Sequence, residues 1–162
     1  MSNNTLQNLQ HGKDEGVSFS DTKKFITVRV NNQLFAISAM DVDDVILPQK
    51  ITPVPLVSSE VIGLLNLRGR VVTVIDLRVK MGMPPSENRL NHKSIVIEYH
   101  DNLYSFVVDD VTGVCDIPVL EIEHNPENLS MDWKKYCSGV YKTEKELMVI
   151  LNIDGLLGIK DN

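Results

Sequence analysis

Short apolar runs separated by turns of small or polar residues recur along this chain, and the stretch 63–77 shows the pattern most clearly. Two apolar runs flank the tripeptide Arg68-Gly69-Arg70 there, and β-branched residues dominate the second run. Gly69 can adopt a positive φ at no steric cost, which allows a tight reversal of the chain. The stretch therefore predicts a buried β-hairpin with Gly69 in its turn and two cationic side chains at its tip.

A second hairpin is predicted over residues 25–37, where apolar and polar residues alternate before the two-residue turn Asn31-Asn32. Further strands are expected at 94–99, 103–108 and 147–153. The pattern between these segments leaves open whether residues 40–46 form a short helical turn or a strand.

Helical structure is expected only as short turns. Asp76 is placed to cap a helix over 77–81, and Ser58 is the expected N-cap of a single helical turn. The segment 121–135 is polar and loop-like, with Trp133 as its one large anchor. The predicted fold class is therefore all-β with short helical turns.

The chain also contains an internal repeat. The hairpin around Asn31-Asn32 matches a pattern 69 positions later, and beyond a longer loop the offset becomes 76, which aligns Gly63 with Gly139. Matching turns, glycines and spacings indicate a duplication over about 25–81 and 94–157. Two such units predict two small β-barrels packed side by side with a groove between them. We expect Gly139, like Gly69, to be a structural turn position.

The ends of the chain differ in composition from its middle. Residues 1–21 contain few large apolar side chains, so they cannot bury enough surface to offset the entropy of ordering, and we predict a disordered arm. The predicted domain spans 22–158, followed by a short tail over 159–162.

The amino-acid composition limits which classes of molecule the protein is expected to bind. The formal net charge of −6 argues against nucleic acid and anionic membranes as main partners, because both select clustered Lys and Arg. No apolar run approaches the ~20 residues of a membrane span, and the start of the chain has no signal-peptide core. A cytoplasmic protein with two reduced cysteines, Cys115 and Cys137, is expected.

No pattern indicates catalysis. The acidic pairs at 43–44 and 109–110 are expected to be turn or surface acids, because adjacent strand residues point to opposite faces. The histidines lack the spacing of a zinc site, and no phosphate-binding loop or nucleophile elbow is present. We therefore expect no metal, no cofactor and no enzymatic activity. Trp133 and Tyr136 are either interface aromatics or core anchors.

Four blocks in order resemble the CheW family of bacterial chemotaxis coupling proteins, from about residue 25 to 157. They are Ile51-Thr52-Pro53-Val54-Pro55, Gly63 with Asn66-Leu67-Arg68-Gly69, Val74-Ile75-Asp76-Leu77-Arg78, and Val107-Val108-Asp109 with Val111. The resemblance implies two five-stranded barrels of the Src-homology-3-like kind. It also implies a non-catalytic adaptor that binds the C-terminal regulatory domain of the histidine kinase CheA, the cytoplasmic tip of chemoreceptors, and other CheW-like domains in array rings at the inner face of the membrane.

The resemblance assigns roles to single residues. Val42, Asp44, Val45 and Gly63 match the kinase-binding face. Arg68 matches the family's signature arginine, which pairs with a residue that is usually Glu and is here Asp44, one methylene shorter. That pair must therefore come closer or be bridged by water, and Arg68→Ala is expected to cost more than a surface ion pair's ~0–1 kcal/mol. Ile95 and Val96 match the strand that lines the receptor groove.

Two other functions stay open from the sequence. One is an adaptor of a chemotaxis-like pathway that controls pili, development or biofilm. The other is a small-ligand-binding or enzymatic β-barrel protein, which a thermal-shift screen against metals and metabolites would detect.

Overall fold

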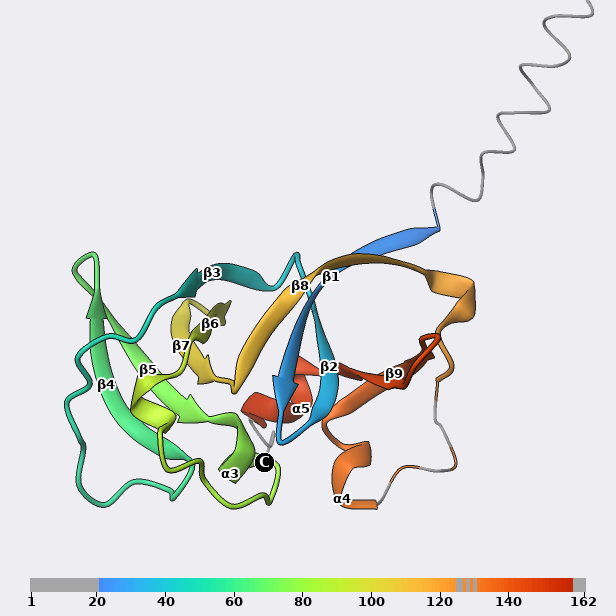
Figure 1. The fold of residues 1–162 in the computed structure, drawn as a ribbon. Coiled ribbons are helices and arrows are strands. Elements are labelled where there is room, and N and C mark those ends of the chain that lie inside the picture. Colours follow the sequence, from blue (N-terminus) through green and yellow to red (C-terminus); the bar gives the residue numbers. More distant parts are fainter. Residues whose placement is uncertain (1–20, 125–126, 128, 130, 159–162) are drawn as a thin grey trace, which may run out of the picture.

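The computed structural model describes residues 21–124, 127, 129 and 131–158 (Figure 1). The predicted arm lies outside the described residues except for Asp21, and the predicted tail over 159–162 lies outside them. The described part of the chain forms ten strands and a few short helices. The strands are β1 (Thr22–Val30), β2 (Gln33–Ser38), β3 (Val42–Ile46), β4 (Val61–Leu67), β5 (Arg70–Asp76), β6 (Ser94–Tyr99), β7 (Asn102–Val107), β8 (Asp110–Pro118), β9 (Cys137–Lys142) and β10 (Leu147–Leu151). The helices are α3 (Leu77–Lys80), α4 (Met131–Lys134) and α5 (Ile153–Leu157), with 3-10 turns η1 (Arg89–Asn91) and η2 (Val119–Glu121).

The strands form two five-stranded sheets that stand next to each other in Figure 1. Sheet A has the order β8-β1-β2-β10-β9, and sheet B has the order β3-β6-β7-β5-β4. Most neighbours are antiparallel, but β2 pairs with β10 and β7 pairs with β5 in parallel. The all-β fold class is confirmed. None of the described helices is long and apolar enough to cross a membrane.

Each sheet combines strands from both halves of the chain. We call β1–β5 the first half and β6–β10 the second half. The hairpin β1–β2 joins three strands of the second half, and the hairpin β6–β7 joins three strands of the first half. The repeat predicts two similar barrels but not this exchange of hairpins between them.

The two sheets agree in register at the offsets found in the sequence. Thr73 pairs with Tyr104 in sheet B, and Val149 pairs with Phe35 in sheet A at the equivalent positions. Register shifts also recur: β3 skips Asp43 against β6, and β8 skips the equivalent Thr112 against β1. Bulges are specific local features of a strand pair. Because the same register shift occurs at equivalent positions, the two halves of the chain share one backbone pattern.

Three apolar clusters hold the molecule together. The largest lies between the sheets and takes side chains from both, including Phe35, Ile95, Phe106 and Leu156. A smaller cluster around Val72 and Val96 fills sheet B, and another around Phe25 and Met148 fills sheet A. Because the largest cluster draws on both sheets, the two subdomains bury a common core.

The predicted turns are confirmed in detail. Asn31 and Asn32 have φ values of 50° and 67°, and Arg68 and Gly69 have φ values of 52° and 82°. Two successive residues with positive φ are what a two-residue hairpin turn requires. The predicted cap is also present, because Asp76 Oδ1 accepts hydrogen bonds from the backbone of α3, with Arg78 N at 3.0 Å.

Other local predictions need correction. Ser58 caps no helix, because the chain makes only a turn there, with Val61 N donating to Ser58 O at 3.0 Å. Gly139 is not a turn residue but lies inside β9. The segment 40–46 was left open between helix and strand, and its residues 42–46 form β3. Trp133 lies in α4 and packs at 5.5 Å from the Phe35 ring, so it is a core anchor.

Candidate functional site

The ion pair between Asp44 and Arg68 joins the edge strand β3 to the tip of the β4–β5 hairpin. Arg68 Nη2 donates to Asp44 Oδ2 at 2.9 Å, so the shorter carboxylate reaches the arginine directly. Asp44 Oδ1 also accepts from Val45 N at 2.8 Å, which fixes the carboxylate against its own strand. The Arg68 side chain is 78% exposed and that of Asp44 is 29% exposed, so the pair is partly buried only on its carboxylate side.

Exposed apolar residues are close to this pair in the sequence. Val45 and Leu47 are exposed next to Asp44 in the chain, and Val71 is exposed just beyond the hairpin tip. Apolar side chains grouped with one polar anchor are typical of surfaces that bind other proteins. We call Asp44, Val45, Leu47 and Arg68 the β3 surface. A shallow pocket of about 520 Å³, lined by Leu64 and Val71 among others, lies next to it.

Gly63 lets the loop between β3 and β4 pack closely on β4. It is buried in β4, where an added Cβ would lie 2.3 Å from the backbone oxygen of Thr52. Thr52 and Leu64 exchange two backbone hydrogen bonds of 2.8 Å, which hold the proline-containing loop on β4. Glycine is needed here because two backbone segments approach each other closely.

Ile95 and Val96 are not surface residues. Both side chains are 0% exposed, Ile95 in the cluster between the sheets and Val96 inside sheet B. A receptor cannot contact these side chains in this structure. Of the same strand, Glu98 and Tyr99 at the end of β6 line an open pocket between the sheets.

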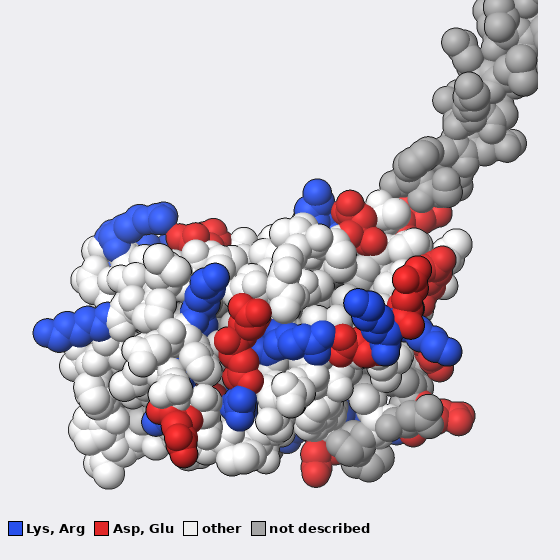
Figure 2. All heavy atoms as spheres, in the orientation of Figure 1, with Lys and Arg blue, Asp and Glu red and all other residues white. Residues whose placement is uncertain are grey.

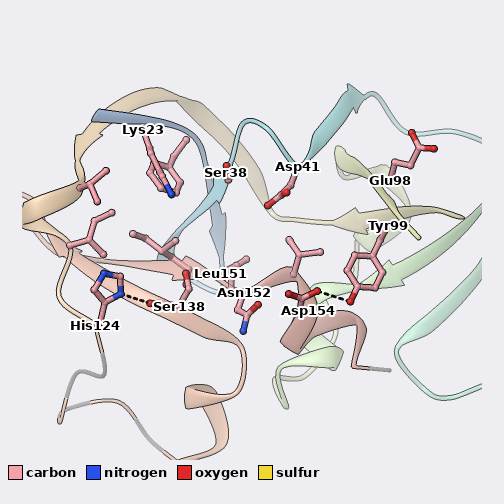
Figure 3. A pocket seen from close by; sticks show the side chains of 15 residues that line it. Lys23, Ser38, Asp41, Glu98, Tyr99, His124, Ser138, Leu151, Asn152 and Asp154 are labelled. Carbon is pink, nitrogen blue, oxygen red and sulfur yellow. Dashed lines mark hydrogen bonds between the residues drawn. The ribbon is translucent and has the colours of Figure 1, made fainter. Parts of the chain in front are cut away.

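An open pocket of about 360 Å³ lies between the two sheets (Figure 3). Its floor is apolar, with Phe25, Ile150 and Leu151, and its rim is polar. Tyr99 from sheet B donates its hydroxyl to Asp154 Oδ1 of α5 at 2.6 Å, which ties the two sheets together at one end. Asp41 also lines the pocket, and burial, helped by the charge of Asp154, raises the pKa of its carboxyl.

The internal repeat relates the residues of this pocket to a second junction between the sheets, around Arg78 and Asp109. An ion-pair network closes that junction. Arg78 Nε donates to Asp109 Oδ1 at 2.8 Å, and Asn31 N donates to Asp109 Oδ2 at 2.7 Å. Burial opposes ionisation of Asp109, but the hydrogen bonds from Arg78 and Asn31 outweigh it and lower the pKa of this carboxyl. Arg89 Nη1 adds a contact of 3.3 Å to the buried Asp76, whose repeat equivalent, Asn152, lines the open pocket.

The metal-site and thiol chemistry considered from the sequence concerns the acidic, histidine and cysteine side chains of the described residues. No group of three or more His, Cys, Asp or Glu side chains in the described part of the chain could hold a metal ion. Burial raises the pKa of the Cys115 and Cys137 thiols, which disfavours reactive thiolates. On the face shown in Figure 2, positive and negative side chains alternate outside the grey atoms.

Sequence reasoning missed the pocket residues Asp41, Glu98, Tyr99 and Asp154. One signal was available, because Glu98 lies two residues after Val96 on a strand whose later part becomes polar. Asp41 lies in the turn after β2 and Asp154 lies in α5 after β10, and the parallel pairing of β2 with β10, which the sequence pattern does not reveal, brings both residues to the same pocket (Figure 3).

Two five-stranded β subdomains that exchange hairpins define the class of fold. The scaffolding protein TtCheW from Thermoanaerobacter tengcongensis has the same fold, with a TM-score of 0.77 and 24% sequence identity over 86% of this chain and 95% of that protein. The family model of the CheW-like domain matches residues 24–160. The chemotaxis protein CheW of Bacillus subtilis (strain 168) is 33% identical over 135 residues, 83% of this chain and 86% of that protein. This chain belongs to the CheW family. Protein PilI of Pseudomonas aeruginosa is also similar, at 27% identity over 76% of this chain and 70% of that protein.

Proposed function

We propose that this protein is a non-catalytic adaptor of chemotaxis signalling that couples chemoreceptors to the histidine kinase CheA. Membership of the CheW family is the observation that carries the proposal. Two separate surface features support the proposal. The β3 surface and the pocket between the sheets could each bind one partner, the kinase and the receptor. The adaptor would work in the cytoplasm, recruited to receptor arrays, where it would also contact other CheW-like domains.

The β3 surface is the proposed kinase face. Val45 offers an exposed apolar side chain, and its neighbour in the strand, Asp44, forms an ion pair with the exposed Arg68. Val42 lies partly buried at the start of the same strand, and Gly63 keeps the loop next to it in place. Binding would cover the apolar part and leave the ion pair at the rim, as in other transient protein interfaces.

The pocket between the sheets is the proposed receptor face. An amphipathic helix can place one or two apolar side chains on the floor made by Phe25 and Leu151, while its polar flank meets the rim. Both sheets line this pocket, so a bound helix contacts both subdomains at once. A small change in how the sheets pack could then alter the β3 surface, which provides a route for a signal without chemistry.

Isothermal titration of the full chain into the CheW-like regulatory domain of a CheA kinase from the same genome tests the kinase face. We expect micromolar or tighter binding, which Val45→Asp weakens at least about tenfold by burying a charge at the contact. The matched control is Val114→Asp on β8, the repeat equivalent of Val45 and also exposed. Equal loss of binding in both variants, or in neither, would contradict the assignment of the β3 surface.

Filling the pocket tests the receptor face. Ser138 is exposed at its rim, so Ser138→Trp should block receptor-tip binding in a pull-down with receptor arrays while kinase binding is retained. Ser59→Trp adds the same side chain at an exposed turn away from the pocket and serves as control. Retained receptor binding by Ser138→Trp would place the receptor elsewhere on the molecule.

A second candidate function is the same adaptor role in a chemotaxis-like pathway that controls pili, development or biofilm. The similarity to Protein PilI is the observation behind it. Deletion of the gene separates the two, because loss of swimming bias supports the first and loss of surface motility with normal swimming supports the second.

A further inference from the structure

Leu56 lies between β3 and β4, in a backbone conformation that leucine rarely adopts. Its φ is 59°, in the left-handed region where the Cβ of most residues meets a steric penalty. The residue is also fully exposed, so packing against the rest of the chain does not offset that penalty. Leu56 therefore carries a conformational penalty without contributing to the apolar core.

The local sequence accounts for the positive φ but not for the leucine. Pro55 and Leu56 are the two central residues of a turn, and the proline ring fixes the φ of the first of them. Proline followed by a residue with positive φ is the pattern of a type II turn, in which Gly or Asn is favoured at the second central position. Because either of those residues would form the same turn with a smaller penalty, the turn alone does not explain a leucine.

The other non-glycine residues with positive φ in the described part of the chain have a structural explanation. They lie at the tips of the hairpins β1–β2, β4–β5 and β6–β7, where a two-residue turn requires that conformation: Asn31, Asn32, Arg68, His100 and Asp101. Leu56 is the one apolar residue of this group and lies outside the hairpins. Unfavourable backbone conformations that the fold does not require are concentrated at functional sites.

The segment that carries Leu56 is fixed on both sides of it. We call residues 47–60 the β3–β4 connector, which runs along the outer side of β4 in Figure 1. Before Leu56, Thr52 exchanges two backbone hydrogen bonds of 2.8 Å with Leu64, and after it Glu60 O accepts a hydrogen bond of 2.7 Å from Asp76 N. Leu56 is thus held in a defined place, which reduces the entropy lost when a partner covers it.

The connector continues the proposed kinase face. Its first residue is the exposed Leu47 of the β3 surface, and Val57 is exposed next to Leu56. Between them, Lys50 and Thr52 of the connector line the shallow pocket that lies next to the β3 surface. Exposed apolar side chains and a concave surface therefore extend from the β3 surface along β4 to Leu56.

We propose that Leu56 is an apolar anchor residue for the regulatory domain of CheA, and that the kinase face extends along the connector to reach it. The inference rests on the proposed function, because it adds a contact to the kinase face described above. An apolar pocket of the kinase domain takes up the Leu56 side chain and removes it from water, which favours binding. In the free protein the turn keeps this side chain in water at a cost to stability.

Leu56→Asn tests the anchor, because asparagine tolerates a positive φ but offers no apolar side chain. We expect stability and affinity to change in opposite directions. The urea midpoint of the full chain should rise with an unchanged slope, because the backbone penalty is relieved. The affinity for the CheA regulatory domain, measured by isothermal titration, should fall about tenfold, because the buried leucine is lost. A residue with a purely structural role would not weaken binding while its replacement stabilises the fold.

Two matched variants serve as controls. Leu56→Met keeps an apolar side chain and the unfavourable φ, so we expect its urea midpoint to be unchanged and its affinity to stay within about threefold. Leu120→Asn makes the same exchange at a residue of η2 that is 87% exposed and has no positive φ. It should neither raise the urea midpoint nor weaken kinase binding.

The outcomes separate this inference from the proposed function. Absence of kinase binding by the unaltered chain would overturn both. Binding that Val45→Asp weakens and Leu56→Asn leaves intact would overturn the anchor role and keep the β3 surface as the kinase face. Equal losses of binding in Leu56→Asn and Leu120→Asn would also overturn it, because any exposed leucine would then have the same effect. A urea midpoint that does not rise in Leu56→Asn would overturn it as well, since the leucine would then carry no penalty that binding has to explain.

Discussion

The β3 surface and its repeat equivalent on β8 share a backbone but not a chemistry. Both are edge strands with a register shift at the same place, and both carry an exposed valine, Val45 at 38% and Val114 at 63%. Asp44 is replaced by Gly113 on β8, and Arg68 is replaced by Glu144 in the turn before β10. The duplicated half therefore keeps the apolar side chain but has no carboxylate at the position of Asp44 and no arginine at that hairpin tip.

This difference separates the origin of the backbone structure from the origin of the surface chemistry. Registers, bulges and turns follow from backbone sterics and apolar spacing, which both halves retain. Surface chemistry depends on single exposed side chains, which differ without disturbing the sheet. Two faces of one fold can thus bind different partners, and variants made at equivalent positions can act as controls for each other.

The largest expected difference between the two halves is at their equivalent glycines. A Cβ at Gly63 would lie 2.3 Å from a backbone oxygen, whereas a Cβ at Gly139 would first meet a side-chain methyl of Ile122 at 2.7 Å. A side chain can rotate away more easily than a hydrogen-bonded backbone can move. We expect Gly63→Ala to lower the free energy of unfolding by about 3 kcal/mol and Gly139→Ala by about 1–2 kcal/mol, measured by urea titration. Equal losses would show that the two loops are held with the same rigidity.

The two junctions between the sheets should also differ, and in a way that depends on pH. Asp109→Asn removes the charge that Arg78 pairs with, so we expect a loss of about 2 kcal/mol at neutral pH. The folded-state pKa of Asp109 is lowered from its ordinary value of 3.8. Its stabilising contribution is therefore complete above that value and is lost as the pH falls through the folded-state pKa. Urea titrations of both proteins at neutral and acid pH should show the gap closing.

Asp154→Asn at the other junction is the matched control. The side-chain oxygen of asparagine can still accept the Tyr99 hydroxyl, so the loss should stay below about 1 kcal/mol. A gap for Asp109→Asn that persists at acid pH would show that its side chain acts through packing rather than charge.

A third comparison concerns the interiors of the two sheets. Ser105 in β7 is fully buried, and its hydroxyl has no hydrogen-bond partner among the described residues, whereas its repeat equivalent in β2 is Ala36. Ser105→Ala should raise the free energy of unfolding by about 1 kcal/mol, because it removes a desolvated hydroxyl. Ala36→Ser should lower it by a similar amount, about 1 kcal/mol or somewhat more. A loss of stability in Ser105→Ala would reveal a hydrogen bond that the hydroxyl makes in solution.

Local features of the fold were predictable because neighbouring residues decide them. The turn at Asn31-Asn32 and the cap at Asp76 depend on a few adjacent side chains and one backbone geometry. The exchange of hairpins was not predictable in this way. Strands of both halves carry the same alternation of apolar residues, so the pattern cannot tell which hairpin joins which three strands.

The site was predictable only in part. Asp44 and Arg68 meet as the family resemblance implies, because both lie near well-defined turns. Ile95 and Val96 failed as contact residues, since the resemblance identifies a strand but not which of its side chains face the core. Gly139 failed as a turn residue because a glycine indicates a turn and a close backbone approach equally well.

The smallest expected effect on stability is at Arg68, the residue for which we expect the clearest effect on signalling. The Arg68 side chain is 78% exposed at a hairpin tip, so Arg68→Ala should change the free energy of unfolding by less than about 0.5 kcal/mol. Glu144→Ala at the equivalent tip should be as mild. In a reconstituted receptor–kinase assay, however, we expect only Arg68→Ala to reduce the kinase response to receptor ligand, because that arginine and Asp44 form a pair that the second half lacks. A normal response in the double variant Asp44→Ala with Arg68→Ala would remove these residues from signalling, and the two faces would then differ in surface chemistry without differing in function.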